Sequence, residues 1–214
     1  LMMIHNYSQL PVTTGGDRGL CGYISWDTIG AALANGKESK VVKDFVNPNV
    51  KTLGLDTPLL KAIRTIYDHD FVVIIGKDKA ISGIVTTTDV SSQFLAFTEP
   101  FVLLEEIENH LRHLLDGKLL LEEVQKLCNV DGRKIEHLDD LTFGDYVSLI
   151  QNPGCWKKLG IDTVDRSTIV EMLNKTRDIR NDIMHFEPAG ITDEQYDLLK
   201  KMCDFLQHIS KYYC

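Results

Sequence analysis

The first half of this chain contains an internal repeat, which constrains its fold more than any local pattern does. Residues 10–25 (LPVTTGGDRGLCGYIS) align without a gap with residues 71–86 (FVVIIGKDKAISGIVT). Each copy has a short apolar run, a turn with Gly and Asp, a second apolar run, and then a helical pattern that follows a hydroxyl residue. This order predicts a strand, a hairpin turn, a strand and a helix in each copy. The identical pairs are Val12/Val73, Gly15/Gly76, Asp17/Asp78 and Gly22/Gly83.

Two further elements are predicted before the second copy. Residues 50–53 are predicted to form a short strand, and residues 58–67 have apolar side chains at helical spacing. The complete unit is therefore predicted to be βαββα. The equivalent first strand of the first copy would lie before Leu1. We therefore expect the natural protein to begin earlier and the first repeat to be incomplete in this sequence.

The two copies resemble the halves of a CBS-domain pair. The resemblance rests on HNYSQLPV followed by GYIS and on GIVTTTDV, and it covers about residues 1–97. It implies that an adenosine nucleotide (AMP, ADP, ATP or a related species) binds between the paired units as a regulatory ligand. The family's pattern is Gly, two apolar residues, Thr or Ser, two free positions and Asp. Residues 83–89 match this pattern, so the resemblance implies that Thr86 and Asp89 bind the ligand.

The chemistry of Thr86 and Asp89 suits a nucleotide. A carboxylate can accept two hydrogen bonds from a ribose diol, and a hydroxyl at a helix N-terminus lies where amides and the helix dipole favour phosphate. The same spacing also describes a capping box, which needs no ligand. The repeat favours ligand binding over a cap alone.

The first copy departs from the ligand pattern. Ser25 keeps the hydroxyl and is a third candidate for ligand binding, but Thr28 stands where the ribose carboxylate belongs. Asp27 is one position out of phase, and one residue turns a side chain by about 100° around a helix. We therefore expect one functional ligand site in the pair.

The second half of the chain is predicted to be helical. Thr98 suits an N-cap and Pro100 is tolerated in a first turn, which indicates a domain boundary near residue 98. A short turn is expected at the Asn152-Pro153-Gly154 sequence. The fold class is therefore α+β, with tandem βαββα repeats in residues 1–97 and an all-α helical bundle in residues 98–214. Helices are predicted from about residue 98 to Gly117 and over residues 119–127, 141–150, 167–186 and 192–206.

The most informative helical segment is TRDIRNDIMHF, residues 176–186. On an ideal helix Arg180 falls inside the apolar stripe, where a guanidinium cannot lose its proton and needs partners. We therefore expect Arg180 to face an interface or a pocket. Arg177, Asn181 and His185 form a neighbouring polar row at i, i+4 and i+8. The alternative for each member of this row is a surface residue near a helix C-terminus.

This segment resembles the HEPN family over roughly residues 99–214. The family's motif is Arg, a polar residue, three further positions and His, near the end of the penultimate long helix. LTFGDYVSLI, the isolated Trp156 and the IRNDIMHFEP context add to the resemblance. It implies that Arg180, Asn181 and His185 are catalytic residues of a metal-independent ribonuclease. Two copies of the motif in a homodimer then form one composite site.

The residue types fit RNA cleavage. Histidine has a pKa near 6.5 and can transfer the proton of a 2′-hydroxyl or of the leaving oxygen. Arginine stabilises the negative charge on a phosphorane through paired donors, and Asn181 could orient the phosphate or the imidazole. Arg180 and His185 lie about 140° apart on one helix, so a single copy would not direct both at one phosphate.

Composition excludes several classes of protein. The five cysteines are scattered without a CxxC spacing, so neither a disulfide framework nor a metal site is indicated. The net charge of −8 argues against binding to extended DNA, and any RNA must be held locally. No apolar run is long enough to span a membrane and no signal peptide is apparent, so a cytoplasmic location is expected.

Two hypotheses follow for the function. In the first, the chain is a nucleotide-regulated, metal-independent endoribonuclease whose helical half is controlled by the adenosine nucleotide. In the alternative, it is a non-catalytic, nucleotide-sensing dimeric interaction module. In that case Arg180 is an interface ion-pair residue and His185 takes no part in chemistry.

Overall fold

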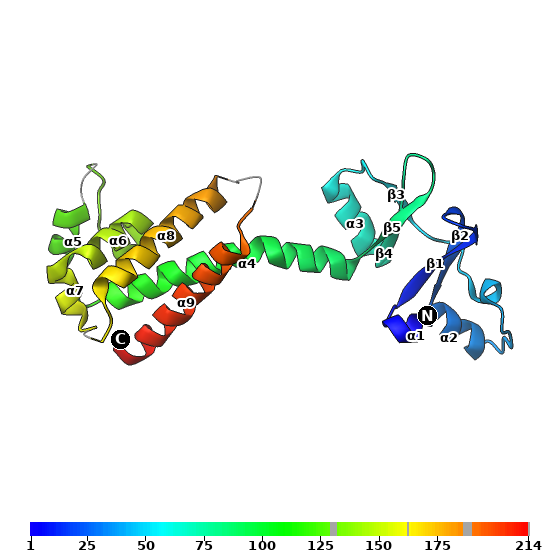
Figure 1. Ribbon diagram of the computed structural model, residues 1–214, viewed down its shortest axis with the longest axis horizontal. Coiled ribbons are helices and arrows are strands. Elements are labelled where there is room, and N and C mark those ends of the chain that lie inside the picture. The colour runs from blue at the N-terminus through cyan, green and yellow to red at the C-terminus, as the bar shows by residue number, and fades with distance from the viewer. Residues whose placement is uncertain (129–131, 162, 186–189, 214) are drawn as a thin grey trace. The chain divides into compact units, whose positions relative to one another are not determined.

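A computed structural model of the protein describes residues 1–128, 132–161, 163–185 and 190–213. The chain divides into two compact units, Leu1–Phe94 and Leu95–Cys214 (Figure 1). The division falls within one long helix, α4 (Thr87–Leu115), a few residues before the boundary predicted near residue 98. Unit 1 contains strands and helices, whereas the described residues of unit 2 contain helices and no strand.

The first copy in unit 1 is an antiparallel hairpin followed by a helix. Strands β1 (Gln9–Gly15) and β2 (Arg18–Ser25) pair along their length, and helix α2 (Trp26–Ala34) begins directly after Ser25. The short helices α1 (Met2–His5) and η1 (Val42–Phe45) lie before and after these elements. Described residues 1–8 contain no strand before β1.

The backbone of Asn47 pairs with the outer edge of β2. Tyr23 N donates to Asn47 O over 2.9 Å, and Asn47 N donates to Tyr23 O over 2.8 Å. This close approach explains the glycine at position 22, where φ is +148° and an added Cβ would lie 2.2 Å from Asn47 O.

The second copy has the βαββα order predicted for it. Its elements are β3 (Thr52–Gly54), α3 (Leu59–His69), β4 (Phe71–Ile75), β5 (Ile81–Thr86) and the first turns of α4. Strand β4 lies in the centre of the sheet, parallel to β3 and antiparallel to β5. Val72 and Val73 of β4 are fully buried, as expected for a central strand covered on both faces.

Three contacts join the two copies within unit 1. Ile81 N donates to Asp17 O over 2.8 Å, and Arg18 forms an ion pair with Asp78. The rings of Tyr23 and Phe71 meet edge to face with their centroids 4.9 Å apart. These residues belong to or border corresponding strands and turns of the aligned segments.

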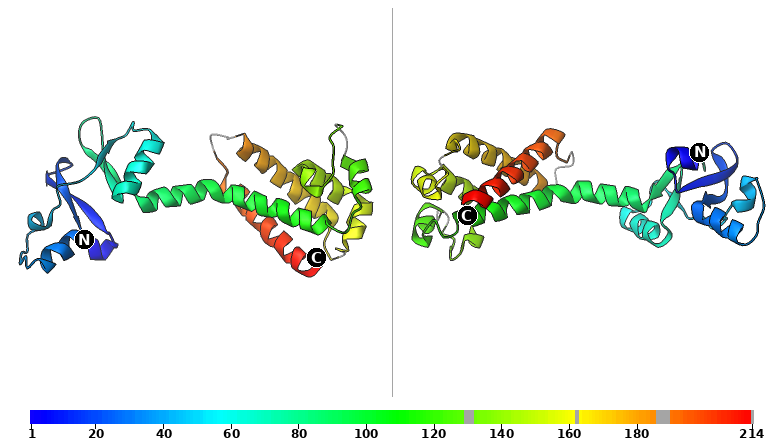
Figure 2. Two further views of the ribbon diagram at one scale, coloured as in Figure 1. Left: turned by 180° about the vertical axis from the view of Figure 1, so that it is seen from behind. Right: turned by 90° about the horizontal axis from the view of Figure 1, so that it is seen from below.

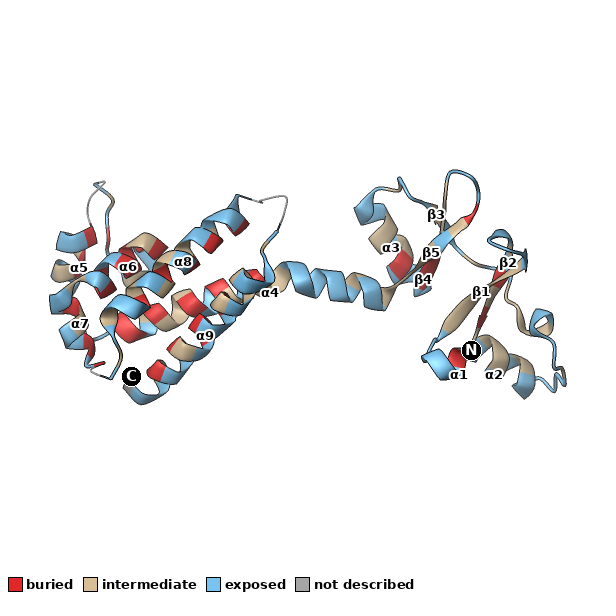
Figure 3. Cartoon of the chain, viewed as in Figure 1, coloured by how far each residue is buried: buried red, intermediate tan, exposed pale blue. Residues whose placement is uncertain are grey.

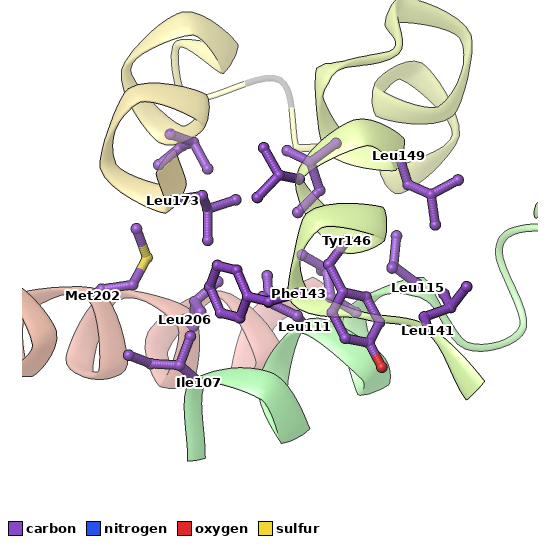
Figure 4. Packing of buried hydrophobic residues seen from close by; sticks show 14 of the residues in the cluster. Ile107, Leu111, Leu115, Leu141, Phe143, Tyr146, Leu149, Leu173, Met202 and Leu206 are labelled. Carbon is purple, nitrogen blue, oxygen red and sulfur yellow. The ribbon is translucent and has the colours of Figure 1, made fainter. Parts of the chain in front are cut away.

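Unit 2 is a helical region around one apolar core. Helices from distant parts of its sequence contribute fully buried side chains such as Ile107, Leu111, Leu173 and Leu206 (Figure 4). Buried positions gather on the inward faces of these helices (Figure 3). The elements after α4 are α5 (Leu121–Cys128), η2 (Leu138–Asp140), α6 (Phe143–Gln151), α7 (Pro153–Leu159), α8 (Arg166–Met184) and α9 (Asp193–Tyr213).

The second half of α4 runs beside α9, as both views in Figure 2 show. Cys203 Sγ donates to Glu106 Oε2 over 3.1 Å, and Ser210 Oγ lies 3.3 Å from His110 Nδ1. Burial, together with the neighbouring Glu106 carboxylate, raises the pKa of the Cys203 thiol to about 12. The thiol therefore keeps its proton and remains a donor at neutral pH.

Two predicted boundaries in the helical half were wrong. Helix α4 continues through Pro100 instead of starting near Thr98, so the proline lies inside the helix and is buried. The Asn152-Pro153-Gly154 sequence starts helix α7 instead of forming only a turn. Asn152 Oδ1 caps this helix by accepting from the backbone N–H of Gly154 and Cys155. Proline suits the first position of such a helix, because no intrahelical partner is needed there.

Candidate functional site

Thr86 and Asp89 form a reciprocal cap at the start of α4. Asp89 Oδ2 accepts from the backbone N of Thr86 over 2.8 Å and from its hydroxyl over 2.7 Å. Thr86 Oγ1 in turn accepts from Asp89 N over 3.2 Å. The capping box is therefore present, and it fixes the orientation of an exposed carboxylate at a helix N-terminus.

The cap leaves part of the Asp89 carboxylate available. Its hydrogen bonds to described residues all use Oδ2, so the acceptor capacity of Oδ1 is unused by the described chain. Hydrogen bonds from the side chain and backbone of Thr86 lower the pKa of Asp89. The group is thus an ionised, oriented acceptor at neutral pH, which is what recognition of a diol requires.

Ser25 and Thr28 make the corresponding cap at the start of α2. Ser25 Oγ accepts from Thr28 N over 3.1 Å, and Thr28 Oγ1 accepts from Ser25 N over 2.9 Å. The Thr28 hydroxyl also lies 3.0 Å from Ser25 O, to which it donates. A neutral hydroxyl that already donates and accepts has little capacity left for a ligand. Asp27 is exposed and takes no part in this cap.

An apolar cavity of about 660 Å³ lies beside the first copy. Its lining comes from α1, β1, Ile24, Trp26 and Val42. Ser25, Thr86 and Asp89 are not among the lining residues, although Ile24 and Trp26 on either side of Ser25 are. Sequence reasoning did not identify this cavity, although Leu10, Pro11 and Val12 of its lining belong to the HNYSQLPV segment that resembles a CBS domain.

Arg180 has a partner within its own chain. Its Nε donates to Glu108 Oε1 over 3.0 Å, and the side chains of the two residues are 30% and 27% exposed. Arg180 is therefore half-buried, as its place in the apolar stripe predicted. However, it faces α4 and does not depend on a second molecule to neutralise its charge, so the expectation of an interface or pocket is replaced by an intrachain ion pair.

Asn181 and His185 are exposed on the adjoining edge of α8. His185 is the C-cap residue, and its backbone N donates to Asn181 O over 2.9 Å. The hydrogen bonds described for Arg180, Asn181 and His185 do not link their side chains to one another. The helix was predicted to end at Phe186, but residues 186–189, which complete the IRNDIMHFEP context, lie outside the described residues.

Glu108 was missed by the sequence reasoning. Helical periodicity indicated that Arg180 needs a partner, but helix α4 carries several acidic residues and nothing in their spacing singles out Glu108. Only the packing of α4 against α8 selects it.

Neither a metal centre nor a membrane span emerges from the described residues. They contain no group of three or more His, Cys, Asp or Glu side chains that could hold a metal ion. Their helices also include none with the length and apolar character needed to cross a bilayer.

Comparison with known proteins identifies one family. Residues 42–95 match the model of the CBS domain, so the segment that contains Thr86 and Asp89 is a CBS domain. No curated protein matches the chain at a significant level.

The chain is similar over part of its length to several solved structures, one of which is a CBS domain pair. The CBS domain pair of protein MJ0100, in complex with 5′-methylthioadenosine and S-adenosyl-L-methionine, is 26% identical with a TM-score of 0.39, covering 44% of this chain and 74% of that chain. A hypothetical conserved protein (GK1048) from Geobacillus kaustophilus is 29% identical with a TM-score of 0.38, covering 44% and 77%. CbpB from Streptococcus agalactiae is 20% identical with a TM-score of 0.40, covering 47% and 67%.

Proposed function

We propose that this protein is an adenosine-nucleotide sensor whose ligand regulates RNA cleavage by its helical half. In this proposal residues 1–97 form a CBS-domain pair, and residues 98–214 form a HEPN-like domain. The observation that supports the sensor most strongly is the capped Asp89 carboxylate within a segment that matches the CBS domain.

The ligand is held at the N-terminus of α4. Asp89 Oδ1 accepts a hydrogen bond from one ribose hydroxyl. A remaining lone pair of the same carboxylate accepts a hydrogen bond from the second ribose hydroxyl. The phosphate lies towards the first turn of α4, where backbone amides and the helix dipole favour an anion. The first copy provides Ser25 but no carboxylate, so one nucleotide binds per pair.

Arg180, Asn181 and His185 carry the RNA chemistry in this proposal. One histidine removes the proton of the ribose 2′-hydroxyl, whose oxygen attacks the adjacent phosphorus, and the 5′-oxygen leaves with a proton from a second histidine. The arginine stabilises the negative charge on the phosphorane. The products are a 2′,3′-cyclic phosphate and a 5′-hydroxyl, and no metal ion is needed for any step.

A homodimer is the expected assembly. Because Glu108 neutralises Arg180 within the chain, the charge of Arg180 no longer requires a partner surface. The different directions of the two catalytic candidates still favour a dimer, since Arg180 faces α4 while His185 is exposed at the C-cap. Two copies are then needed to bring an arginine and a histidine to one phosphate. Light scattering at micromolar concentration should return twice the chain mass of 24.2 kDa. A stable monomer that still cleaves RNA would contradict the composite site.

The experiment that tests the proposed function is an RNA-cleavage assay on the purified full chain in the presence of EDTA. We expect cleavage to continue when metals are chelated and the products to carry 2′,3′-cyclic phosphate ends. Loss of cleavage in EDTA, with recovery on adding a divalent cation, would refute the histidine mechanism.

One observation favours the second candidate, a non-catalytic nucleotide-sensing interaction module. Glu108 neutralises Arg180 within the chain, and an acidic protein of net charge −8 offers RNA little general attraction. In that case the helical unit reports nucleotide binding to a protein partner. The same assay separates the two candidates, since the module binds nucleotide normally but leaves RNA intact under all conditions.

A further inference from the structure

The segment of α4 that carries Glu108 is firmly anchored in unit 2. Its neighbours Ile107 and Leu111 are fully buried in the core, and Leu104 is nearly so. The hydrogen bond that Glu106 accepts from Cys203 and the one between His110 and Ser210 join α4 to α9 on both sides of Glu108. Packing of the core therefore fixes the backbone at Glu108, and the position of its carboxylate is more restricted than that of a flexible surface residue.

This anchored carboxylate holds one edge of the Arg180 guanidinium. The contact is made through Nε, the donor closest to the helix backbone. Neither terminal Nη group donates a hydrogen bond to a described residue, so within the described chain the paired donors of the outer edge are not engaged. That edge is the one that recognises phosphate oxygens in bidentate geometry.

Glu108 has two opposing effects on a phosphate ligand. Its negative charge reduces the positive potential at Arg180, which weakens attraction of the substrate from solution. Its hydrogen bond also restricts the guanidinium to one orientation, so the donors need not reorganise when charge develops on the phosphorane. Positioning of this kind affects the chemical step more than substrate binding.

We infer that Glu108 is a positioning residue that orients Arg180 for phosphate. This inference rests on the proposed function, in which Arg180 contacts the reacting phosphate. Glu108 itself touches neither the substrate nor the reacting atoms, and its role is exerted entirely through the guanidinium.

The test compares single-turnover RNA cleavage by full-length variants. Glu108→Ala should lower the rate of the chemical step by about 10- to 100-fold, the scale of a slightly misplaced catalytic group, while RNA affinity stays unchanged or improves. Glu108→Gln keeps an acceptor oxygen and should fall between wild type and Glu108→Ala. Glu105→Gln is the matched control, since it changes the charge of the same helix at an exposed residue with no ion pair to a described residue, and should behave as wild type.

A double variant separates positioning from a structural effect. If Glu108 acts only through Arg180, Glu108→Ala should cause no further loss in an Arg180→Ala background. Additive losses, or a Glu108→Ala enzyme as fast as wild type, would overturn the inference while leaving the proposed function in place. A wild-type protein that does not cleave RNA would instead reject the proposed function, and the inference with it.

Discussion

His185→Ala should reduce RNA cleavage to background, a loss of about 10² to 10⁴ in rate, because it removes the group that we propose transfers the proton. Structure, dimerisation and nucleotide binding should be retained. His185 is an exposed C-cap residue whose described hydrogen bond uses its backbone, so its truncation should change the free energy of unfolding by no more than about 0.5 kcal/mol. Single-turnover cleavage and thermal unfolding of the same preparation measure the two effects.

His208→Ala is a matched control for this variant. His208 is also exposed in unit 2, and its ring packs against Tyr212 near the end of α9. Its removal should leave the cleavage rate unchanged. Cleavage that persists in pure His185→Ala protein would exclude His185 as the proton carrier and would favour the interaction module.

Asp89→Ala should weaken adenosine-nucleotide binding by about 1.5 to 3 kcal/mol, the range for hydrogen bonds to a charged group. This corresponds to roughly 10- to 100-fold in the dissociation constant measured by calorimetry. The variant also loses the cap on Thr86, which on its own costs on the order of 1 kcal/mol of stability. Binding should therefore be measured well below the unfolding temperature.

Two further variants identify the cause of this loss. Asp89→Asn keeps an oxygen that can cap Thr86 but lacks the charge, so it should bind nucleotide more weakly than wild type while its unfolding temperature changes little. Thr28→Ala in the first copy should have a small effect, because the Thr28 hydroxyl is already engaged with Ser25. Equal affinity in wild type and Asp89→Ala would show that Thr86 and Asp89 form only a capping box.

Local features of the fold were predictable from sequence because their causes lie within a few residues. The caps at Ser25 and Thr86 follow from side chains three positions away, and helices α2 and α4 begin directly after them. The prediction that a helix starts near Pro100 was wrong, because the length of α4 is not determined by residues close to the proline. A proline is compatible with both a first turn and a long helix whose neighbours compensate, and local rules favour the first turn.

The candidate sites were predictable only in part. Residue types and spacing indicated Thr86 and Asp89, and periodicity placed Arg180 inside the apolar stripe of its helix. The identity of the partner could not be predicted, because Glu108 lies in a different helix and reaches Arg180 only when α4 and α8 share a core. The free Oδ1 of Asp89 likewise depends on which oxygen the cap uses, a detail of geometry and not of spacing.

The central claim is that a nucleotide bound at Asp89 controls RNA cleavage by the helical half. Its most direct test is the RNA-cleavage rate of the full-length protein in EDTA, measured across a titration of adenosine nucleotide, for wild type and Asp89→Ala. We expect the wild-type rate to change and saturate with nucleotide, while the variant shows the same response only at roughly 10- to 100-fold higher concentration. A wild-type rate that is zero throughout, or one that does not depend on nucleotide, would contradict it.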